Sequence, residues 1–464
     1  MLKPYDDYID TEISWVPIAP AHWEMLRAKY MFSKESRPVA PSDKVVTCFR
    51  DGTVTLRENR RTTGFTESVN ETGYQGVRCG DLVLHVMDAF AGAIGVSDSN
   101  GKCTPVYSCC TSKGNYNHYY YAFLLREMAR AGYIQSLYRG IRERSSDFRF
   151  DVFAQQFLLI PPRPEQDQIV RFLDWKTSEM AHFIKEKKRE IRRLHELKRA
   201  ITNKAVTRGL HDNVPMKETG IEWMPHIPAH WDVCPLRQFL FSVSEKNHPD
   251  MPLLSVTREQ GVIQRDVEDF DTNHNYIPDD LSGYKLVRKG QFVINKMKAW
   301  QGSYGVSEYD GIVSPAYFIF NLRFPNKKFF HFAMRSRIYV NFFAQFSDGI
   351  RTGQWDLSMQ KMKHIPFFVP SEEEQEEILR VVPAKIAEID AMIAALNEEI
   401  ALVQELRTKT VADVATGKID VRNVEIPRFE VETEEPTDEE DADEESGEED
   451  TEETDDNVDE EVDE

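Results

Sequence analysis

The sequence has little cysteine and lacks the spacings in which cysteine builds sites. Its 464 residues include six cysteines, and no two of them form a Cys-x-x-Cys pair. We therefore expect buried or free thiols, and neither a disulfide framework nor a structural zinc site. Long apolar runs are also missing: none approaches the ~18 residues that cross a bilayer, and residues 1–7 contain no apolar signal core. These absences predict a cytoplasmic protein with no membrane partner.

Signatures of catalysis and cofactor binding are missing as well. The sequence has no G-x-x-x-x-G-K-[ST] phosphate loop, no G-x-G-x-x-G turn, no H-E-x-x-H and no G-x-S-x-G. It also lacks the deaminase His/Cys set and the Asn/Asp-Pro-Pro-Tyr/Phe strand end that amino-methyltransferases use to hold a flipped base. We therefore predict no catalytic residue, no metal site and no cofactor bound by this chain. The alternative is a stand-alone nuclease or methyltransferase on an unfamiliar scaffold, which would turn over DNA without a partner.

Basic residues are absent from the C-terminal end. Residues 430–464 contain 23 Asp or Glu and no Lys or Arg, whereas the whole chain carries a net charge of −21. Without that segment, 57 basic residues face 55 acidic ones (78 less 23), so the rest of the chain is near neutral. The overall charge thus does not exclude a nucleic-acid partner. Composition predicts that residues 426–464 form an acidic, disordered tail.

The sequence repeats itself after about 210 residues. The segment 18–23 (Ile-Ala-Pro-Ala-His-Trp) returns as 226–231 (His-Ile-Pro-Ala-His-Trp), and the Gly-Tyr … Gly-Val-Ser pattern of 73–107 returns at 283–317. Each copy closes with a Glu-Gln pair, at Glu165 and Glu374, that opens a helical segment. We expect each His-Trp pair to be a packing corner and not a site. Two similar units in one chain favour pseudo-twofold symmetry, which suits a target such as duplex DNA.

Strand-like runs at 82–86 and 157–160 and a helix over 119–131 predict a mixed first domain, and residues 216–370 repeat its pattern. Long helices should follow each domain. The first extends from 165 to about 208 before Gly209. The second follows a capping box at Ser371 and Glu374, ends before Gly417, and should be broken in two by Pro383.

Apolar residues on both helices follow a heptad pattern. In the second helix the spacing is 3, 4, 3, 4, 3, at Ile386, Ile389, Ile393, Leu396, Ile400 and Val403; the first helix has a looser version at Ile184, Ile191 and Leu194. Each helix could instead pack on its own domain. A seam this narrow favours pairing of the two helices. The predicted fold class is α+β, with two mixed α/β domains separated by two long helices that form an antiparallel coiled coil.

Basic and aromatic residues recur in matched regions of the two domains. Arg contacts guanine edges, Asn and Gln contact adenine, and Lys mainly contacts phosphate. The candidate DNA-binding residues are Arg57, Arg60, Arg61, Lys113, Asn115, Arg142 and Arg144 in the first domain, and Lys296, Lys298, Trp300, Arg351 and Gln354 in the second. Further basic residues, among them Arg335, extend these regions. Residues 36–70 and 245–278 share little between the copies, and we hypothesise that they carry much of the sequence recognition.

Residues from about 10 to 422 resemble the specificity subunits of type I restriction-modification systems. The resemblance rests on the Trp-x-Pro … Ile-Pro-x-His-Trp opening, the Pro-Pro-x-x-Glu-Gln-x-x-Ile helix start and the Leu/Ile seams. It implies target recognition domains at 1–163 and 211–371 and helical spacer regions at 164–210 and 372–425. Each domain would recognise one half of a bipartite, asymmetric DNA sequence. The second junction has one extra residue and a single proline, and the acidic tail is not part of the family pattern.

The resemblance also implies partners. Two methyltransferase subunits would dock on the helices, restriction subunits would join them, and S-adenosylmethionine, ATP and Mg²⁺ would be bound by those partners. Adenine methylation would belong to the methyltransferase. A coiled-coil scaffold without a nucleic-acid role is an alternative, although it leaves the matched basic loops unexplained. A complex that only methylates is a further alternative.

Overall fold

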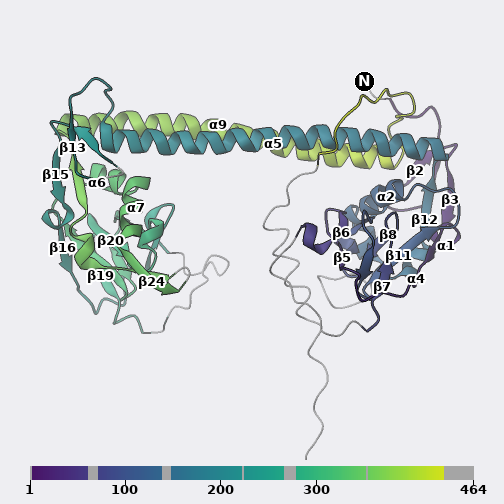
Figure 1. Cartoon of the computed structure of the whole chain (residues 1–464), viewed down its shortest axis with the longest axis horizontal. Helices are drawn as coiled ribbons and strands as arrows, with labels where there is room; N and C mark the ends of the chain where they lie inside the picture. Colours follow the sequence, from purple (N-terminus) through teal and green to yellow (C-terminus); the bar gives the residue numbers. More distant parts are fainter. Residues whose placement is uncertain are drawn as a thin grey trace, which may run out of the picture. The chain divides into compact units, whose positions relative to one another are not determined.

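The structure, a computed structural model, describes residues 3–60, 72–137, 148–221, 224–265, 278, 280–351 and 354–432 (Figure 1). The chain divides into two compact units. The first comprises residues 1–188 and 398–464, and the second comprises 189–397. Each unit combines antiparallel sheets with helices, so the predicted mixed fold class is confirmed.

The first unit is built on a four-stranded antiparallel sheet that is covered on both faces. Its strand order is β4 (Phe32–Lys34), β11 (Tyr107–Ser112), β8 (Leu82–His85), β9 (Ile94–Val96). Helix α2 (His118–Arg130) packs on one face with Leu82 and Leu84, whereas Val83 faces a second, smaller core. This alternation is the period of two that a strand imposes on its side chains. The smaller core is closed by the hairpin of β5 (Val46–Cys48) with β6 (Val54–Leu56) and by the antiparallel pair of β7 (Gln75–Val77) with β10 (Gly101–Cys103).

The second unit repeats this arrangement strand for strand. Its sheet has the order β16 (Leu240–Val243), β23 (Tyr317–Leu322), β20 (Gln291–Asn295), β21 (Tyr304–Val306). Phe292 and Ile294 face helices α6 (Lys327–Met334) and α7 (Arg337–Gln345), and Val293 faces two pairs of strands. These are the hairpin of β17 (Leu254–Thr257) with β18 (Gly261–Gln264) and the antiparallel pair of β19 (Lys285–Val287) with β22 (Gly311–Val313). The sequence repeat is therefore a repeat of whole domains.

Smaller elements complete each unit. The first unit also holds β1 (Tyr8–Asp10) with β2 (Ile18–Pro20), β3 (Glu24–Arg27) with β12 (Phe157–Ile160), α1 (Ala28–Met31), α3 (Tyr133–Ser136), α4 (Phe150–Gln155) and the 3-10 turns η1 (Arg57–Asn59) and η2 (Ala89–Ala91). The second holds β13 (Met216–Glu218) with β14 (His226–Pro228), β15 (Asp232–Pro235) with β26 (Pro366–Val369), β24 (Ser347–Arg351) with β25 (Gln354–Leu357), α8 (Met359–Met362), η3 (Leu236–Gln238) and η4 (Ala299–Gln301). The six cysteines are free thiols, and four of them are buried.

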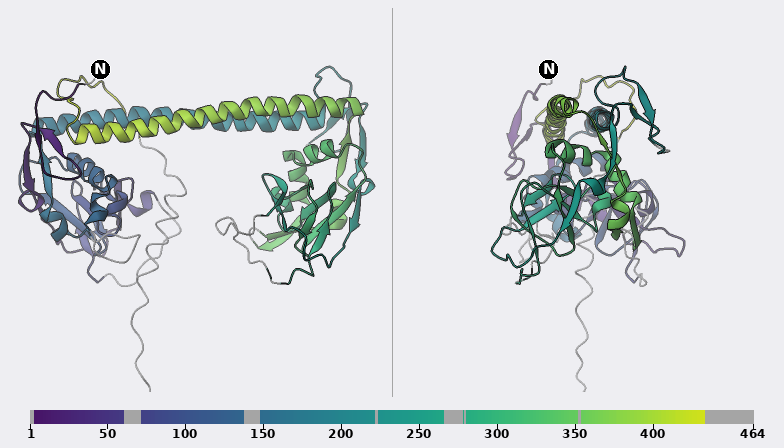
Figure 2. Two further views of the ribbon diagram at one scale, coloured as in Figure 1. Left: turned by 180° about the vertical axis from the view of Figure 1, so that it is seen from behind. Right: turned by 90° about the vertical axis from the view of Figure 1, so that its left-hand side faces the viewer.

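Two long helices, α5 (Arg163–Arg208) and α9 (Glu372–Ala415), lie side by side within each unit (Figures 1 and 2). In the first unit Lys187 pairs with Glu399, Nζ to Oε2, at 2.7 Å. In the second unit Lys198 pairs with Asp390. The partner number falls as the α5 number rises, so the helices run antiparallel.

Helix α9 is continuous through Pro383, so the predicted break at this residue is wrong. A proline inside a helix removes one hydrogen bond and crowds the preceding turn, at a cost of about 3 kcal/mol. Here Ile378 and Val382, before the proline, are buried in the core of the second unit, and Ile386, after it, packs partly buried against the same core, while Pro383 itself is exposed. Packing on both sides of the proline offsets its cost.

The repeated His-Trp pair holds the start of each long helix. In the first unit the indole Nε1–H of Trp23 donates to Glu165 at 2.9 Å, and the His22 ring lies 2.9 Å from the second carboxyl oxygen. The Tyr5 hydroxyl donates to the same carboxyl at 2.5 Å, and burial together with that carboxyl raises the pKa of Tyr5 well above its ordinary value. Glu165 is only 5% exposed. The packing interpretation of this motif is confirmed.

The second unit uses the same carboxyl clamp, with the Ser371 backbone N–H in place of a tyrosine hydroxyl. Trp231 and His230 contact Glu374 at 3.1 and 2.9 Å, and Glu374 also closes the predicted capping box with Ser371 at 3.3 Å in both directions. The incoming end of the opposite helix packs against the same tryptophan. A Cβ built on Gly417 would lie 2.8 Å from Trp23, and one on Gly209 would lie 3.4 Å from Trp231. Each corner therefore joins the start of one long helix to the end of the other.

After α9 the chain returns along the first part of α5. The Gln168 amide donates to the carbonyls of Val421 and Val424 at 3.0 and 2.8 Å. Further along, the Glu432 carboxylate pairs with His182 and Lys185 on α5. Residues 418–432 are thus packed on the first unit. The remainder of the predicted acidic tail, residues 433–464, lies outside the described residues.

Replacing Glu165 with alanine should destabilise the first unit, because the Tyr5 hydroxyl and the Trp23 indole N–H would stay buried without an acceptor. We expect a loss of about 2–4 kcal/mol in the free energy of unfolding, measured by urea denaturation. Glu179, an exposed carboxylate on the same helix, pairs only with neighbouring Lys176. Glu179→Ala should cost less than ~0.5 kcal/mol. Similar losses in both variants would contradict the clamp.

Candidate nucleic-acid interface

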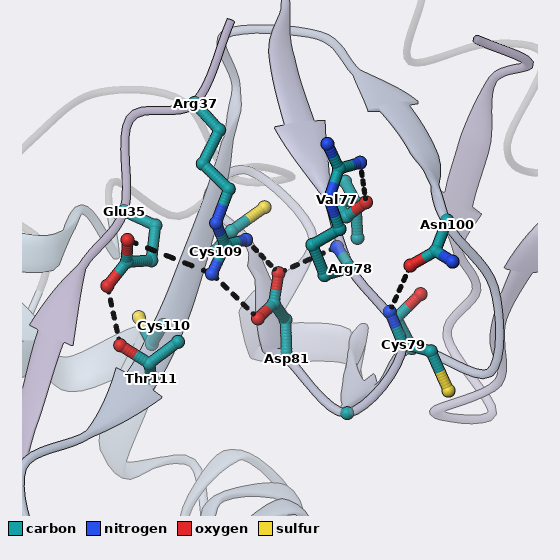
Figure 3. Close-up of polar contacts among 12 residues, drawn as sticks. Glu35, Arg37, Val77, Arg78, Cys79, Asp81, Asn100, Cys109, Cys110 and Thr111 are labelled. Atoms are coloured by element: carbon teal, nitrogen blue, oxygen red, sulfur yellow. Dashed lines mark hydrogen bonds and ion pairs between the residues drawn. The ribbon is translucent and has the colours of Figure 1, made fainter. Parts of the chain in front are cut away.

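Each variable stretch begins at an ion pair with a shared turn. In the first unit Arg37 forms two hydrogen bonds with the buried carboxylate of Asp81, the second of them, from Nη2 to Oδ1, at 3.1 Å (Figure 3). The backbone N–H of Arg78 donates to the same carboxylate at 2.8 Å. Asp81 thus fixes both its own turn and the start of stretch 36–70. The paired carboxylate also raises the pKa of Arg37, so the guanidinium stays charged.

The second unit has the same anchor with the charges exchanged. There the guanidinium belongs to the turn, as Arg288, and the carboxylate belongs to the variable stretch, as Glu245, with Nη2 to Oε1 at 3.0 Å. Gln291 takes the place of Asp81 and accepts from the Arg288 backbone N–H at 2.7 Å. The turn is therefore shared scaffold, and the pair that attaches the variable stretch to it differs between the units.

Hairpins β5–β6 and β17–β18 lie within the variable stretches and have matching tips. The first-unit tip is Arg50 and Asp51, and the second-unit tip is Arg258 and Glu259, 208 residues later. Both tips contact the segment around the 3-10 turn that follows the central strand. In the first unit, Arg50 donates to Asp88, the residue before η2, at 3.1 Å. This correspondence lies in a region where the two sequences show little similarity.

The candidate residue Arg60 lies beside the first-unit tip, whereas Arg57 lies at the open end of the same hairpin. Arg60 pairs with Asp51, Nη1 to Oδ2, at 2.7 Å, and its guanidinium lies 4.3 Å from the Phe49 ring centroid. Its side chain is only 11% exposed. The backbone N–H of Arg57 donates to the Val45 carbonyl at 2.9 Å, and its half-buried side chain donates to the Thr47 hydroxyl at 3.3 Å. In this conformation Arg60 supports the tip, and Arg57 is held against β5.

Lys113 and Asn115 belong to a different part of the first unit. Lys113 is exposed and donates to the Lys29 carbonyl of α1 at 2.8 Å. The Asn115 side-chain oxygen accepts from Arg163 at the start of α5 at 2.6 Å. Their anchors are α1 and α5, whereas Arg57 and Arg60 are anchored to β5 and its tip. The structure therefore does not bring these two candidate groups together.

Some candidates fall where their side chains are not described. Arg61, Arg142 and Arg144 lie outside the described residues. Arg351 and Gln354 are placed at the facing ends of β24 and β25 by their backbone pairing. The position of the β24–β25 hairpin is fixed at its base, where Leu357 N–H donates to the Lys296 carbonyl at 3.1 Å.

In the second unit the candidates gather around η4. Lys298 is exposed at the start of this turn, and Trp300 lies within it. The Trp300 ring packs on Trp355 of β25 with centroids 5.1 Å apart. Lys296 reaches Asp356 of the same strand at 3.0 Å, Nζ to Oδ2. The structure thus joins Lys296, Lys298 and Trp300 to the hairpin that carries Arg351 and Gln354. Trp355, partly exposed here, was not among the predicted residues.

Arg335, grouped with the basic loop residues from the sequence, occupies a structural position. Its guanidinium donates to the carbonyls of Gly302 and Tyr304 at 2.9 and 3.0 Å. It also donates to the carbonyls of Arg258 and Glu259 at the second-unit tip, the latter at 2.7 Å. Burial lowers the pKa of Arg335. Four backbone carbonyls therefore occupy its donors.

His331 lies beneath the same hairpin as a neutral acceptor. Its Nδ1 accepts from the backbone N–H of Val306 at 3.0 Å, and its ring lies against Gly261 and Gly305. Burial lowers the pKa of His331, and the nearby Arg335 guanidinium lowers it further. An uncharged imidazole is thus part of the surface on which β17–β18 rests. Sequence pattern alone had no means of identifying this histidine, since a single His is most often structural.

The described residues contain no group of three or more His, Cys, Asp or Glu side chains arranged to hold a metal ion. Within the same residues, no helix combines the length and the apolar character required to cross a bilayer.

Comparison with known proteins gives similarity of structure only. No protein-family model matches the chain, and no curated protein matches it. Among solved structures, a chain from a study of complex assembly and conformational transition of the type I R-M system aligns with 86% of this chain and 99% of its own length, at a TM-score of 0.60 and 12% identity. The HsdS subunit from Thermoanaerobacter tengcongensis aligns with 86% of this chain and 98% of its own length, at a TM-score of 0.45 and 13% identity. The S subunit of the type I system of M. genitalium aligns with 85% of this chain and 96% of its own length, at a TM-score of 0.32 and 12% identity. The first of these shows a shared fold, and the resemblance seen in the sequence is confirmed at that level.

Acid should weaken the second unit through His331. Its folded-state pKa is lowered, so the unfolded chain takes up the proton first and stability is lost as the pH falls below about 6.5. His331→Asn keeps an acceptor for the Val306 N–H but cannot titrate, so its urea midpoint should fall less between pH 7 and pH 5. His364 is an exposed histidine of the same unit. His364→Asn should show the same fall in urea midpoint between pH 7 and pH 5 as the wild type. An equal fall in the wild type and both variants would contradict the role of His331 in acid sensitivity.

Proposed function

We propose that this chain is the non-catalytic, sequence-specific DNA-binding subunit of a type I restriction-modification complex. It recognises a bipartite, asymmetric DNA target and directs a partner adenine methyltransferase and partner restriction subunits to it. Residues 1–163 and 211–371 are the two recognition domains, and 164–210 and 372–425 are the spacer regions. S-adenosylmethionine, ATP and Mg²⁺ belong to the partners.

The observation that carries this proposal is the duplicated architecture. Two domains with the same strand order are each joined to both long helices by a His-Trp corner. The shared fold with a chain of the type I R-M system extends over 86% of the protein. Such a chain can present two different surfaces to two segments of one duplex. The differing anchors of the variable stretches fit an asymmetric target, since each domain recognises its own half.

We propose that recognition in the second domain centres on η4 and the β24–β25 hairpin. Lys298 would contact phosphate, and Arg351 and Gln354 would contact base edges. The paired Trp300 and Trp355 would give the hairpin a rigid base. In the first domain Arg57 and the tip of β5–β6 would contact the DNA. Arg60 would act mainly by holding that tip, because its guanidinium is already paired.

The seam residues support the proposed pairing of the spacer helices. Ile184, Ile389, Ile393, Leu396 and Ile400 are buried, and Ile191, Leu194, Ile386 and Val403 are partly buried. Outward positions of α9 still carry large apolar side chains, with Met392, Leu402 and Leu406 each more than half exposed. These are positions at which two methyltransferase subunits would dock, because exposed apolar groups of this size favour a protein partner.

Methylation in the assembled complex tests the proposal. Co-purified with an adenine methyltransferase partner and S-adenosylmethionine, the chain should direct methylation to a motif of two specific halves separated by a fixed gap. Sequencing of methylated positions in a random DNA library measures this. The purified chain alone, with Mg²⁺ and S-adenosylmethionine, should show no turnover. Turnover by the chain alone, or methylation without a split motif, would contradict the proposed function.

Length of the paired helices should set the gap. Inserting one heptad into α5 beside Lys198 and one into α9 beside Asp390 keeps the seam in register and adds ~10 Å of helix. At 3.4 Å per base pair, the gap should grow by about three base pairs while both half-sequences stay the same. If the heptad is inserted in α5 alone, its added seam residues have no partners on α9, and the free energy of unfolding should fall. Altered half-sequences with an unaltered gap would disprove the spacer role.

A further inference from the structure

We propose that Arg335 is a positioning residue for specificity: its guanidinium sets the placement of hairpin β17–β18 relative to η4, and thereby the DNA half-sequence that the second domain accepts. This inference rests on the proposed function and extends it to a residue whose guanidinium donates to backbone carbonyls of the protein.

The geometry of Arg335 suits this role. The residue follows α6 and is held there by its own backbone N–H, which donates to the His331 carbonyl at 3.1 Å. One side of the guanidinium, Nη1, binds the carbonyls of Gly302 and Tyr304, immediately after η4. The other side, Nη2, binds the carbonyls of Arg258 and Glu259 at the tip. One planar group therefore links a scaffold helix to two loops.

Of the two linked loops, the tip lies in a variable stretch, whereas η4 lies in the shared repeat with Lys298 in place of Asp88 and Trp300 in place of Phe90. The η4 segment carries Lys298 and Trp300, and the tip carries Arg258, whose side chain is 65% exposed. The side chains of Arg258 and Glu259 pair with each other, at 3.6 Å between Nε and Oε1, while their backbone carbonyls accept from Arg335. Backbone carbonyls exist in every sequence, so Arg335 can hold tips of different side chains. Arg335 thus fixes the position of the tip but does not determine which side chain of the tip contacts the DNA.

The first domain attaches its tip by a different chemistry at the same place. The Arg50 side chain binds Asp88, and the backbone of Gly92 lies so close to the Arg50 carbonyl that an added Cβ would be 2.8 Å from it. Asp88 corresponds to Lys298 in the repeat, since Met87 and Met297 match at the preceding position. A carboxylate thus holds the tip in one domain and a guanidinium holds it in the other. A substitution can therefore weaken the attachment of one tip and leave the attachment of the other tip unchanged.

Lysine cannot replace Arg335 in this arrangement. A guanidinium offers five N–H groups in a rigid plane and reaches carbonyls on two sides, whereas an ammonium is a compact point charge on a flexible stem. Arg335→Lys keeps the charge and most of the volume but loses the span between η4 and the tip. The conservative variant is therefore the informative one, because it limits the risk of global unfolding.

The experiment combines hydrogen exchange with methylation mapping in the full chain bound to its methyltransferase partner. Arg335→Lys should speed amide exchange in β17–β18 and leave exchange in β19–β22 unchanged. Discrimination against single mismatches in the half-sequence read by the second domain should fall at least about fivefold, the other half staying intact, since one mismatch ordinarily costs ~1–3 kcal/mol. Asp88→Asn should relax the opposite half only. Arg237, exposed on η3, supplies the control Arg237→Lys, which should change neither measurement.

The outcomes separate the two proposals. Unchanged exchange in β17–β18, or equal loss of methylation at all sites with both halves still discriminated, would overturn the positioning role while leaving the proposed function standing. A wild-type complex that methylates without any split motif would overturn the proposed function. In that case faster exchange of β17–β18 would still establish Arg335 as the residue that holds the hairpin.

Discussion

A carboxyl group at the start of each long helix is the interaction on which the architecture depends. Glu165 and Glu374 each accept from a tryptophan indole and lie within hydrogen-bond distance of a histidine. Because the tryptophan also packs against the glycine that ends the opposite helix, one residue pair orients two helices against one domain. If a flexible linker joined the helix to its domain, the orientation of the helix relative to that domain would not be fixed. Here the exit is a polar cluster around a buried tryptophan, which has a specific orientation because each donor requires its acceptor.

The domains separate scaffold from variable parts in a consistent way. The central sheet and its β-turns recur with the same strand order, and the hairpins β5–β6 and β17–β18 carry the differing sequences. Attachment of those hairpins is also local to each domain: Arg37 with Asp81 in one, Glu245 with Arg288 in the other. An ion pair with exchanged charges holds the same place in the fold while the surrounding sequence diverges. Surface variation is tolerated in this design because the apolar core beneath it stays constant.

Some basic residues of the chain are paired with other protein groups and others are accessible at the surface, and the composition does not distinguish the two. Arg60 and Arg335 look like surface cations in the sequence, yet each is committed to neighbouring protein groups. The exposed Lys298 and the half-buried Arg57 are better placed for a polyanionic partner. A basic residue therefore indicates a nucleic-acid contact only when its donors are not already occupied by carboxylates or carbonyls, because a satisfied guanidinium gains little from a new partner.

The repeat, the fold class, the long helices with their glycine ends, and the capping box at Ser371 were determined by the sequence alone, because periodicity and local capping act over a few residues. Other features required the tertiary structure. The core around Val382 carries α9 through Pro383, which local propensity would have broken. The convergence of Trp300 with Trp355 and the four carbonyls on Arg335 join segments far apart in sequence. No spacing rule encodes such contacts, since they depend on where the folded sheet places the ends of its loops.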